Sequence, residues 1–245
     1  MEGSGWELFS VALIVAALYT ASVVRQRGKA FWSEPPSAPD RELARRAGFL
    51  WLFPPSVVLH ELGHAVATWA VGGRITEFGF FGYSGFVVPA GRFTPAQAWL
   101  ISVAGPAVSV AVALGLLAAG RWAFRLGTTA RLMLVDGGGL QLTWILVGYP
   151  LFALGGFGDF RVIYDVGATP VLCALAAVLH AGLIVALSRG LHGRAERAVL
   201  GAPPVPAQPT SPAPAVADEP AAPPRAPRRR RPPPADPGAT GATLP

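Results

Sequence analysis

Charged side chains are scarce in this sequence of 245 residues. They make up 14% of it, against roughly 25% in soluble globular proteins. Hydrophobic residues make up 52%, although a compact chain of this length still exposes about a quarter to a third of its surface. A soluble domain cannot bury so many apolar side chains. The composition therefore excludes an ordinary soluble protein and predicts a membrane protein.

Lysine and cysteine are scarce as well. Lys29 is the one lysine among 20 basic residues, and Cys173 is the one cysteine, which excludes an internal disulfide. A net charge of +6 and a pI near 10.4 are typical of nucleic-acid binding. However, the basic residues lie between apolar runs or in the tail, where topology signals and disordered arms occur. We therefore expect no nucleic-acid partner.

Five apolar runs are candidates for crossing the hydrocarbon core of a bilayer, which takes about 20 helical residues. They are Leu8–Val24, Phe49–Val71, Ala96–Ala119, Leu140–Leu154 and Val162–Ser188. The fourth is short and rich in glycine, so we expect it to tilt, break or enter from one side. The predicted fold is an all-α multi-pass membrane protein with about five transmembrane helices.

Successive connecting segments between the apolar runs alternate between many and few arginines. The arginines cluster after the first, third and fifth apolar runs, and the other connecting segments hold few. The positive-inside rule then predicts an amino terminus outside and a carboxyl terminus in the cytoplasm.

The segment Arg74–Pro95 differs from its neighbours. It is aromatic, β-branched and punctuated by glycine, which favours a short β-hairpin-like insert over a helix. A hairpin at membrane depth must have its backbone paired or covered by protein. The alternative is an interfacial loop with a belt of tyrosine and phenylalanine.

The chain divides into three predicted segments. Residues 1–48 hold the first transmembrane anchor and a basic loop, residues 49–190 form the membrane core, and residues 191–245 form a disordered tail. From Gly201 onward the tail holds 15 of the 25 prolines and the run Arg228–Arg231, a composition that buries too little apolar surface to fold.

The second apolar run contains the motif His60-Glu61-Leu62-Gly63-His64. On a helix, residues four apart stand on one face about 6 Å apart along the axis, so His60 and His64 can bind one metal ion. Glu61 is rotated by about 100° and reaches a metal-bound water rather than the metal. Zinc lowers the pKa of such a water to about 7, and a carboxylate can accept its proton as the water attacks a carbonyl.

The surroundings of this motif favour a functional site. A lone glutamate at the centre of a bilayer costs roughly 2.5–3.5 kcal/mol, so such residues are functional candidates by default. Pro54 and Pro55 precede the motif, and consecutive prolines predict that the helix bearing it begins within the membrane at about Pro55 and Ser56. A plain proline kink is the alternative.

Two histidines leave a tetrahedral zinc site in need of a third protein ligand and an open position. The candidates in the later spans are Asp136, Asp159, Asp165 and His180, and spacing does not choose among them. Asp159 follows an irregular segment with Pro150 and three glycines, which allows its carboxylate to enter the bundle. Asp136 lies in the sequence VDGGG, which is typical of an Asp-Gly turn.

These motifs together resemble the site-2 protease family of intramembrane zinc metalloproteases, in its compact bacterial branch. The likeness rests on the histidine motif in a membrane helix, on Ala104-Gly105-Pro106 about forty residues later, and on an aspartate near a broken fourth span. It covers about Phe49–Asp165.

The resemblance implies an activity and a set of roles. His60 and His64 would bind Zn2+, Glu61 would be the general base, and Asp159 would be the third ligand. The strand that receives an unwound transmembrane substrate would lie within Arg74–Pro95. The protein would then hydrolyse peptide bonds of membrane-spanning substrates from within the lipid bilayer, in a bacterial cell membrane.

The sequence departs from the family at its second motif, where the family places asparagine and proline before Asp-Gly. Here Phe160 follows Asp159, and Pro150 lies nine residues earlier with no asparagine nearby. Asp136, which two glycines follow directly, is therefore the runner-up for the third ligand. The family's active site also faces the cytosol, whereas the arginine count places Asp159 outside.

Two other functions use the same residues. One is a catalytically inactive membrane adaptor that keeps a structural metal site. The other is an ion transporter, because intramembrane histidine and aspartate also mark ion paths. A transporter is less favoured, since the first and third apolar runs hold almost no polar residues.

Overall fold

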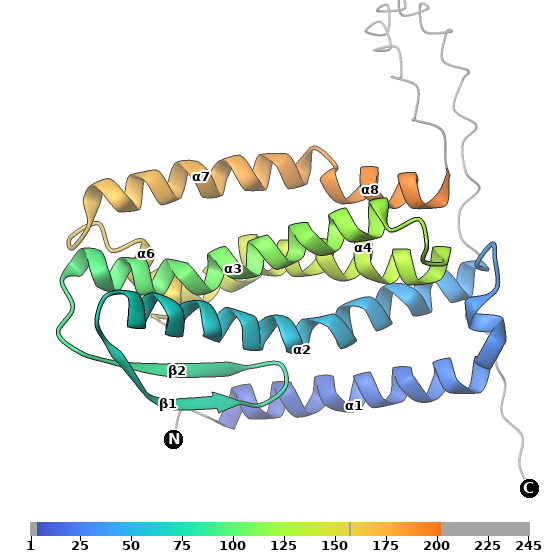
Figure 1. The fold of residues 1–245 in the computed structure, drawn as a ribbon, viewed down its shortest axis with the longest axis horizontal. Coiled ribbons are helices and arrows are strands. Elements are labelled where there is room, and N and C mark those ends of the chain that lie inside the picture. The colour runs from blue at the N-terminus through green and yellow to red at the C-terminus, as the bar shows by residue number, and fades with distance from the viewer. Residues whose placement is uncertain (1–3, 157, 202–245) are drawn as a thin grey trace, which may run out of the picture. The chain divides into compact units, whose positions relative to one another are not determined.

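A computed structural model describes residues 4–156 and 158–201. These residues are mostly helical, with one small antiparallel sheet (Figure 1). A 3-10 turn at Gly28–Trp32 follows α1, and a π-helical turn at Trp144–Gly148 follows α4. In chain order the other elements are α1 (Ser4–Arg27), α2 (Ala38–Ala70), β1 (Arg74–Phe80), β2 (Gly85–Ala90), α3 (Pro95–Trp122), α4 (Thr128–Thr143), α5 (Tyr149–Leu154), α6 (Asp159–Ile163), α7 (Pro170–Ser188) and α8 (Leu191–Leu200).

The core lies where α2, α3 and α4 pack against one another, with α1 and α7 outside them (Figure 1). Glycines allow this close approach. A Cβ on Gly48 of α2 would lie 2.2 Å from the carbonyl oxygen of Met133, and one on Gly138 would lie 2.7 Å from that of Ala113. Small residues at helix interfaces are typical of membrane bundles, because backbones in van der Waals contact hold such bundles together.

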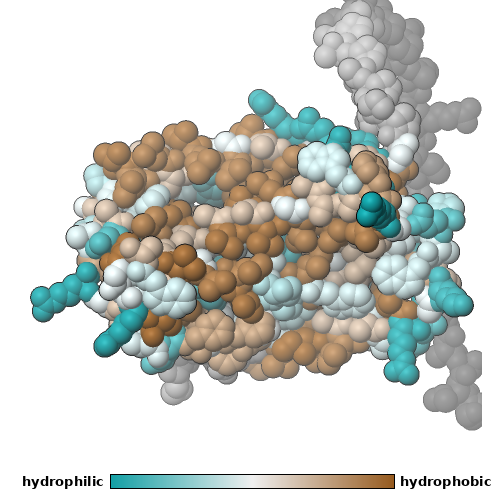
Figure 2. All heavy atoms as spheres, viewed as in Figure 1, coloured by the Kyte–Doolittle hydropathy of each residue, from teal (hydrophilic) through white to brown (hydrophobic). Residues whose placement is uncertain are grey.

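Four helical segments within the described residues are long and apolar enough to cross a membrane. They are Leu8–Trp32, Pro95–Trp122, Thr128–Leu151 and Pro170–Leu200. Their outer faces are strongly apolar, as Figure 2 shows for the visible face, and on α7 Val171 is 71% exposed and Val178 75%. An apolar surface of this extent needs a membrane or a partner around it, so a multi-pass membrane protein is supported.

The structure confirms a helical membrane fold but not all of its predicted spans. The run Phe49–Val71 lies in α2, which does not qualify as a fifth span, because the histidine motif brings polar residues into it. The fourth span begins at Thr128 rather than Leu140. The fifth begins at Pro170, since α6 and a loop occupy the start of Val162–Ser188.

The helix that carries the histidine motif does not begin at Pro55, as one interpretation of the sequence expected. It runs unbroken through Pro54 and Pro55, and Ser37 caps its first turn by accepting a hydrogen bond from the Asp40 amide. Proline has no N–H, so Pro54 leaves the carbonyl of Leu50 without its helical donor. The hydroxyl of Tyr83 donates to that carbonyl at 2.5 Å. A side chain from the hairpin thus supports the helix where proline weakens it.

The predicted hairpin is confirmed. β1 and β2 pair antiparallel, from Arg74 opposite Ala90 to Phe80 opposite Gly85, with an irregularity between Ile75 and Glu77. The hairpin packs against α2, which is the protein cover that a hairpin at membrane depth needs.

The predicted boundary of the tail is wrong. Residues 191–200 form α8, which packs on α3 and α4. Leu191, Ala195 and Val199 recur every four residues and so share one face of this helix, and Ala195 and Val199 are buried. Residues 202–245, the rest of the predicted tail, lie outside the described residues. The core also begins before residue 49, because α2 begins at Ala38 within the segment expected to be a basic loop.

Candidate active site

The histidine motif occupies the buried side of α2. Glu61 and His64 are buried and His60 is half-buried, whereas Leu62 and Val66 of the same helix are exposed. The spacing of four residues brings the two imidazoles together, with their Nε2 atoms 3.1 Å apart. The polar face of this helix therefore points into the bundle and its apolar face points out.

The outer nitrogens of both imidazoles have partners on α3. Nδ1 of His64 donates to the carbonyl oxygen of Ile101 at 2.7 Å, and Nδ1 of His60 lies 2.9 Å from the hydroxyl of Ser109. A carbonyl only accepts, so neutral His64 carries its proton on Nδ1 and a lone pair on Nε2. This is the arrangement that metal-binding histidines use, with the second nitrogen fixing the ring.

Asp159 at the start of α6 completes the group. Its carboxylate oxygens lie 3.1 Å from Nε2 of His60 and 3.3 Å from Nε2 of His64. The hydroxyl of Tyr149 donates to the same carboxylate at 3.0 Å. One ligand atom from each of His60, His64 and Asp159 lies within 4.8 Å of the others, so the three residues can hold a metal ion.

Gly105 leaves room beside these ligand atoms. A Cβ at Gly105 would lie 2.3 Å from Nε2 of His64 and 2.7 Å from Nε2 of His60. Any side chain there would occupy the space between the imidazoles. Gly63 serves the same crossing of α2 and α3, because a Cβ there would lie 2.8 Å from the carbonyl oxygen of Ala104. The Ala104-Gly105-Pro106 motif thus has a steric role at the site.

A cavity of about 430 Å³ opens beside Glu61. Residues from α2, the hairpin, α3 and the end of α4 line it, and they include His60, Glu61, Ser109 and Tyr149. The hairpin approaches closely at Gly85, where a Cβ would lie 3.1 Å from Cγ of Glu61. The segment Arg74–Pro95 therefore forms one wall of the cavity.

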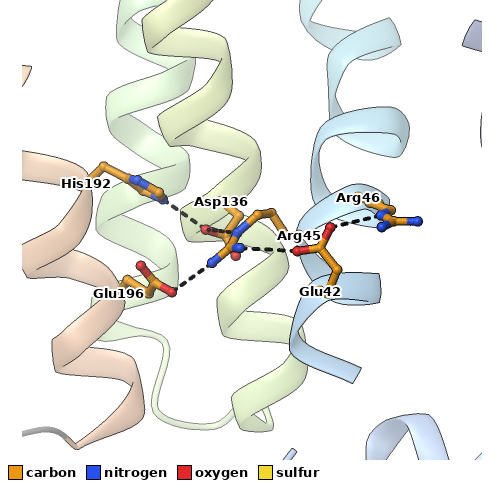
Figure 3. A network of polar contacts seen from close by, with 6 residues as sticks. All are labelled: Glu42, Arg45, Arg46, Asp136, His192 and Glu196. Carbon is orange, nitrogen blue, oxygen red and sulfur yellow. Dashed lines mark hydrogen bonds and ion pairs between the residues drawn. The ribbon is translucent and has the colours of Figure 1, made fainter. Parts of the chain in front are cut away.

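Asp136, the runner-up for the third ligand, lies in a different group. It is 2% exposed on α4, and Nε2 of His192 lies 2.9 Å from its carboxylate. Arg45 of α2 reaches Asp136 at 3.6 Å and Glu196 of α8 at 3.1 Å (Figure 3). Burial lowers the pKa of Arg45, but the carboxylates of Asp136, Glu196 and Glu42 outweigh that effect and raise it. We call these residues the Arg45 network.

The interpretation of VDGGG as a turn is wrong. All of these residues lie inside α4 and are buried. Glycine usually weakens a helix, but here each glycine faces a different neighbour. Cβ atoms on Gly137, Gly138 and Gly139 would lie within 2.7 Å of Gly48, Ala113 and His192 respectively.

The other two candidates for the third ligand are also accounted for. Nε2 of His180 donates to the carbonyl oxygen of Leu146 at 2.7 Å, in the π-helical turn before α5. Nδ1 of the same ring is hydrogen-bonded to the hydroxyl of Tyr164. Asp165 accepts from the amide of Ala168 in the loop before α7.

Sequence reasoning missed two residues of the site, Ser109 and Tyr149. Ser109 was detectable as one of the rare polar residues in the third apolar run. Tyr149 carried no such signal, because tyrosine is common at the ends of membrane spans.

Residues 51–152 match the family model described as Peptidase M50B-like. This segment is a site-2 protease family domain. The match confirms the resemblance inferred from the sequence over this segment, and the family of the segment supports a membrane metalloprotease. The matched segment contains the histidine motif, the hairpin and Asp136, and it ends before Asp159. No curated protein and no solved structure matches the chain.

Proposed function

We propose that the protein is an intramembrane zinc metalloprotease that hydrolyses peptide bonds of membrane-spanning substrates. The observation that carries this proposal is the convergence of His60, His64 and Asp159 within 4.8 Å of one another, directly beside the buried carboxylate of Glu61. The site-2 protease domain over residues 51–152 supports the same reaction class.

The donor set fits zinc. Two imidazole nitrogens and one carboxylate are a usual catalytic zinc set, which leaves a fourth position open. The hydrogen bonds from Nδ1 of His64 to Ile101 and from the Tyr149 hydroxyl to Asp159 orient two of the three ligands. Gly105 keeps side chains out of the space between the imidazoles. We therefore assign His60, His64 and Asp159 as the residues that would hold the ion.

Zinc supplies Lewis-acid chemistry when bound, since it polarises a carbonyl oxygen and makes water more acidic. Glu61 would act as general base: its carboxylate accepts a proton from the attacking water and then passes it to the leaving amine. Glu61 is buried against the hairpin at Gly85, so bulk water does not compete for that proton. Tyr149 holds the Asp159 carboxylate in place.

The substrate would enter along the hairpin within Arg74–Pro95. A two-stranded sheet leaves strand edges unpaired, and an extended peptide can add to such an edge. A transmembrane helix must unwind before it can do so, and a lipid-surrounded cavity walled by β2 and α4 gives the unwound segment polar partners. The arginine distribution still predicts a cytoplasmic carboxyl terminus.

Peptide cleavage by the Glu61→Gln variant tests the proposal. The purified protein in detergent, loaded with zinc, is incubated with a proteome-derived peptide library, and new termini are identified by mass spectrometry. We expect cleavage by the native protein and none by Glu61→Gln at equal zinc content. Glu34→Gln removes an exposed carboxylate before α2 and should cleave normally. Equal cleavage by Glu61→Gln, or no cleavage by the zinc-loaded native protein, would contradict the proposal and favour an adaptor.

A further inference from the structure

A polar side chain that the proposed chemistry does not use lines the cavity beside Glu61. Gln141 of α4 is 5% exposed and lines the cavity together with His60 and Glu61. Its Nε2 is buried, and it has no hydrogen-bond partner among the described residues. About 90% or more of buried polar groups in proteins are hydrogen-bonded, so such an exception requires an explanation.

The position of Gln141 relates it to the site. Gln141, Trp144, Ile145 and Tyr149 all line the cavity, and their spacing places them on one face of the helix and of the π-helical turn that follows. Tyr149 is the residue whose hydroxyl donates to Asp159. The unpaired amide therefore belongs to the same wall that holds the third carboxylate.

The chemistry of the cavity indicates what fills it. The amide nitrogen of Gln141 offers two neutral N–H donors, which suit the carbonyl oxygen of a peptide backbone. The lining also holds several large aromatic side chains, with Phe53, Phe81, Phe86 and Trp144, beside serine hydroxyls. A volume of about 430 Å³ falls within the range of ligand cavities, roughly 300–1,000 Å³. A peptide segment with a large apolar side chain satisfies both the donor and the walls.

Resting on the protease function proposed above, we infer that Gln141 is a substrate-binding residue. Its carboxamide turns about its terminal bond so that Nε2 faces the cavity and donates a hydrogen bond to a backbone carbonyl of the substrate. A large apolar side chain next to the scissile bond fills the rest of the cavity. The substrate class is thus a membrane-spanning segment whose cleavage site is flanked by phenylalanine, tryptophan, leucine or methionine.

The variant Gln141→Met tests the hydrogen bond, because methionine keeps the length of the side chain and removes the donor. We expect kcat/KM for a cleaved library peptide to fall about tenfold, the effect of one lost hydrogen bond. Thermal stability should stay equal or rise, since an unpaired buried donor is removed. Thr169→Val is the matched control: Thr169 Oγ1 is also buried without a partner among the described residues, but Thr169 does not line the cavity, so kcat/KM should not change.

Peptide binding gives a second measurement that does not need turnover. In the Glu61→Gln background the Kd of the same peptide should rise about tenfold when Gln141→Met is added. Unchanged kcat/KM and Kd in Gln141→Met would overturn the inference while leaving the protease function intact. A drop in thermal stability with unchanged Kd would also overturn it.

The cleavage profile of the native protein tests the side-chain preference. We expect large apolar residues to be enriched within two positions of the cut bond, and Trp144→Ala to shift that preference toward larger side chains. A profile without any such enrichment would overturn the substrate class. Absence of all cleavage by the zinc-loaded native protein would instead contradict the protease function itself, so the two failures can be told apart.

Discussion

The described part of the chain holds two groups of acidic and histidine residues, and these groups differ in the charge that lies beside the carboxylates. Asp159 lies against two imidazole Nε2 atoms, and its ion pairs within the described residues are with His60 and His64. Asp136 lies against one imidazole and a guanidinium, that of Arg45. Each group brings three ligand-type atoms within 4.8 Å of one another. The distances between ligand-type atoms therefore do not show which of the two groups binds a metal ion.

The difference is the source of positive charge. In the Arg45 network the protein supplies the cation itself, and Arg45 balances Asp136 and Glu196 (Figure 3). This network ties α2, α4 and α8 together and serves stability. Beside Glu61, the Nε2 atoms of two imidazoles face Asp159, and a metal cation bound between these groups would supply the positive charge. A buried carboxylate indicates a metal site only when no side-chain cation already pairs with it.

The largest expected effect is the loss of cleavage when a histidine beside Glu61 is removed, and a histidine of the Arg45 network gives the comparison. His64→Ala removes a proposed zinc ligand and should reduce peptide cleavage by roughly a thousandfold or more, because several kcal/mol of transition-state stabilisation are lost. His192→Ala removes the imidazole of the Arg45 network and should cleave at nearly the native rate. Initial rates on one library peptide measure both. A comparable loss of cleavage rate in His192→Ala would contradict the view that the two groups differ in function.

Zinc affinity should respond to the hydrogen bond behind a ligand. Ser109→Ala removes the hydroxyl 2.9 Å from Nδ1 of His60, and loss of such a support typically costs 10–100-fold in metal affinity. Ser188→Ala on α7 is the matched control, because that hydroxyl is exposed and donates to the carbonyl oxygen of Val185 in its own helix. Competition with a zinc chelator measures both variants. An unchanged zinc affinity in Ser109→Ala would show that the hydrogen bond between Ser109 and His60 does not contribute to zinc binding.

Stability should respond to the Arg45 network instead. Asp136→Ala leaves Arg45 and His192 without their buried partner and should lower the free energy of unfolding by roughly 1–3 kcal/mol. The value stays below that of a fully buried pair because Arg45 is 44% exposed. Denaturant titration of zinc-free protein in micelles measures it. Glu42→Ala, an exposed member of the same network, should change stability by at most about 1 kcal/mol.

Two glycines of the bundle should respond to alanine in opposite directions. Gly48→Ala places a methyl group 2.2 Å from the carbonyl oxygen of Met133 and should cost about 1–3 kcal/mol. Gly115→Ala on α3 meets nothing within 4 Å and should stabilise by about 0.5–1 kcal/mol, because alanine favours the helix. The same denaturant titration measures both variants. If Gly48→Ala changed the free energy of unfolding no more unfavourably than Gly115→Ala, α2 and α4 would not pack as closely as described.

Much of the fold could be predicted from the sequence. Apolar runs and a change in residue pattern at Arg74 were enough for the helices and the hairpin, because both signals are local. The extent of α2 and the helical state of VDGGG were not predictable, because they depend on contacts between distant segments. Tyr83 supports α2 beyond Pro54, and the three glycines are helical because neighbouring helices need their small volume.

The residues of the candidate site also differ in whether the sequence alone could predict them. His60, Glu61 and His64 follow from spacing within one helix. Which aspartate joins them does not, because Asp136 and Asp159 are both acidic residues beside glycines, and the choice depends on where α6 begins relative to α2. Gln141 stands out in the sequence only as a polar residue in the fourth apolar run, a signal that does not say what its side chain faces.

Zinc content tests the central claim most directly. The native protein, Asp159→Ala and Asp136→Ala are purified side by side, and bound zinc is measured by mass spectrometry after dialysis against a weak chelator. The account predicts about one zinc per chain in the native protein and in Asp136→Ala, and a loss of most of it in Asp159→Ala. Full zinc in Asp159→Ala together with its loss in Asp136→Ala would contradict the assignment of the site.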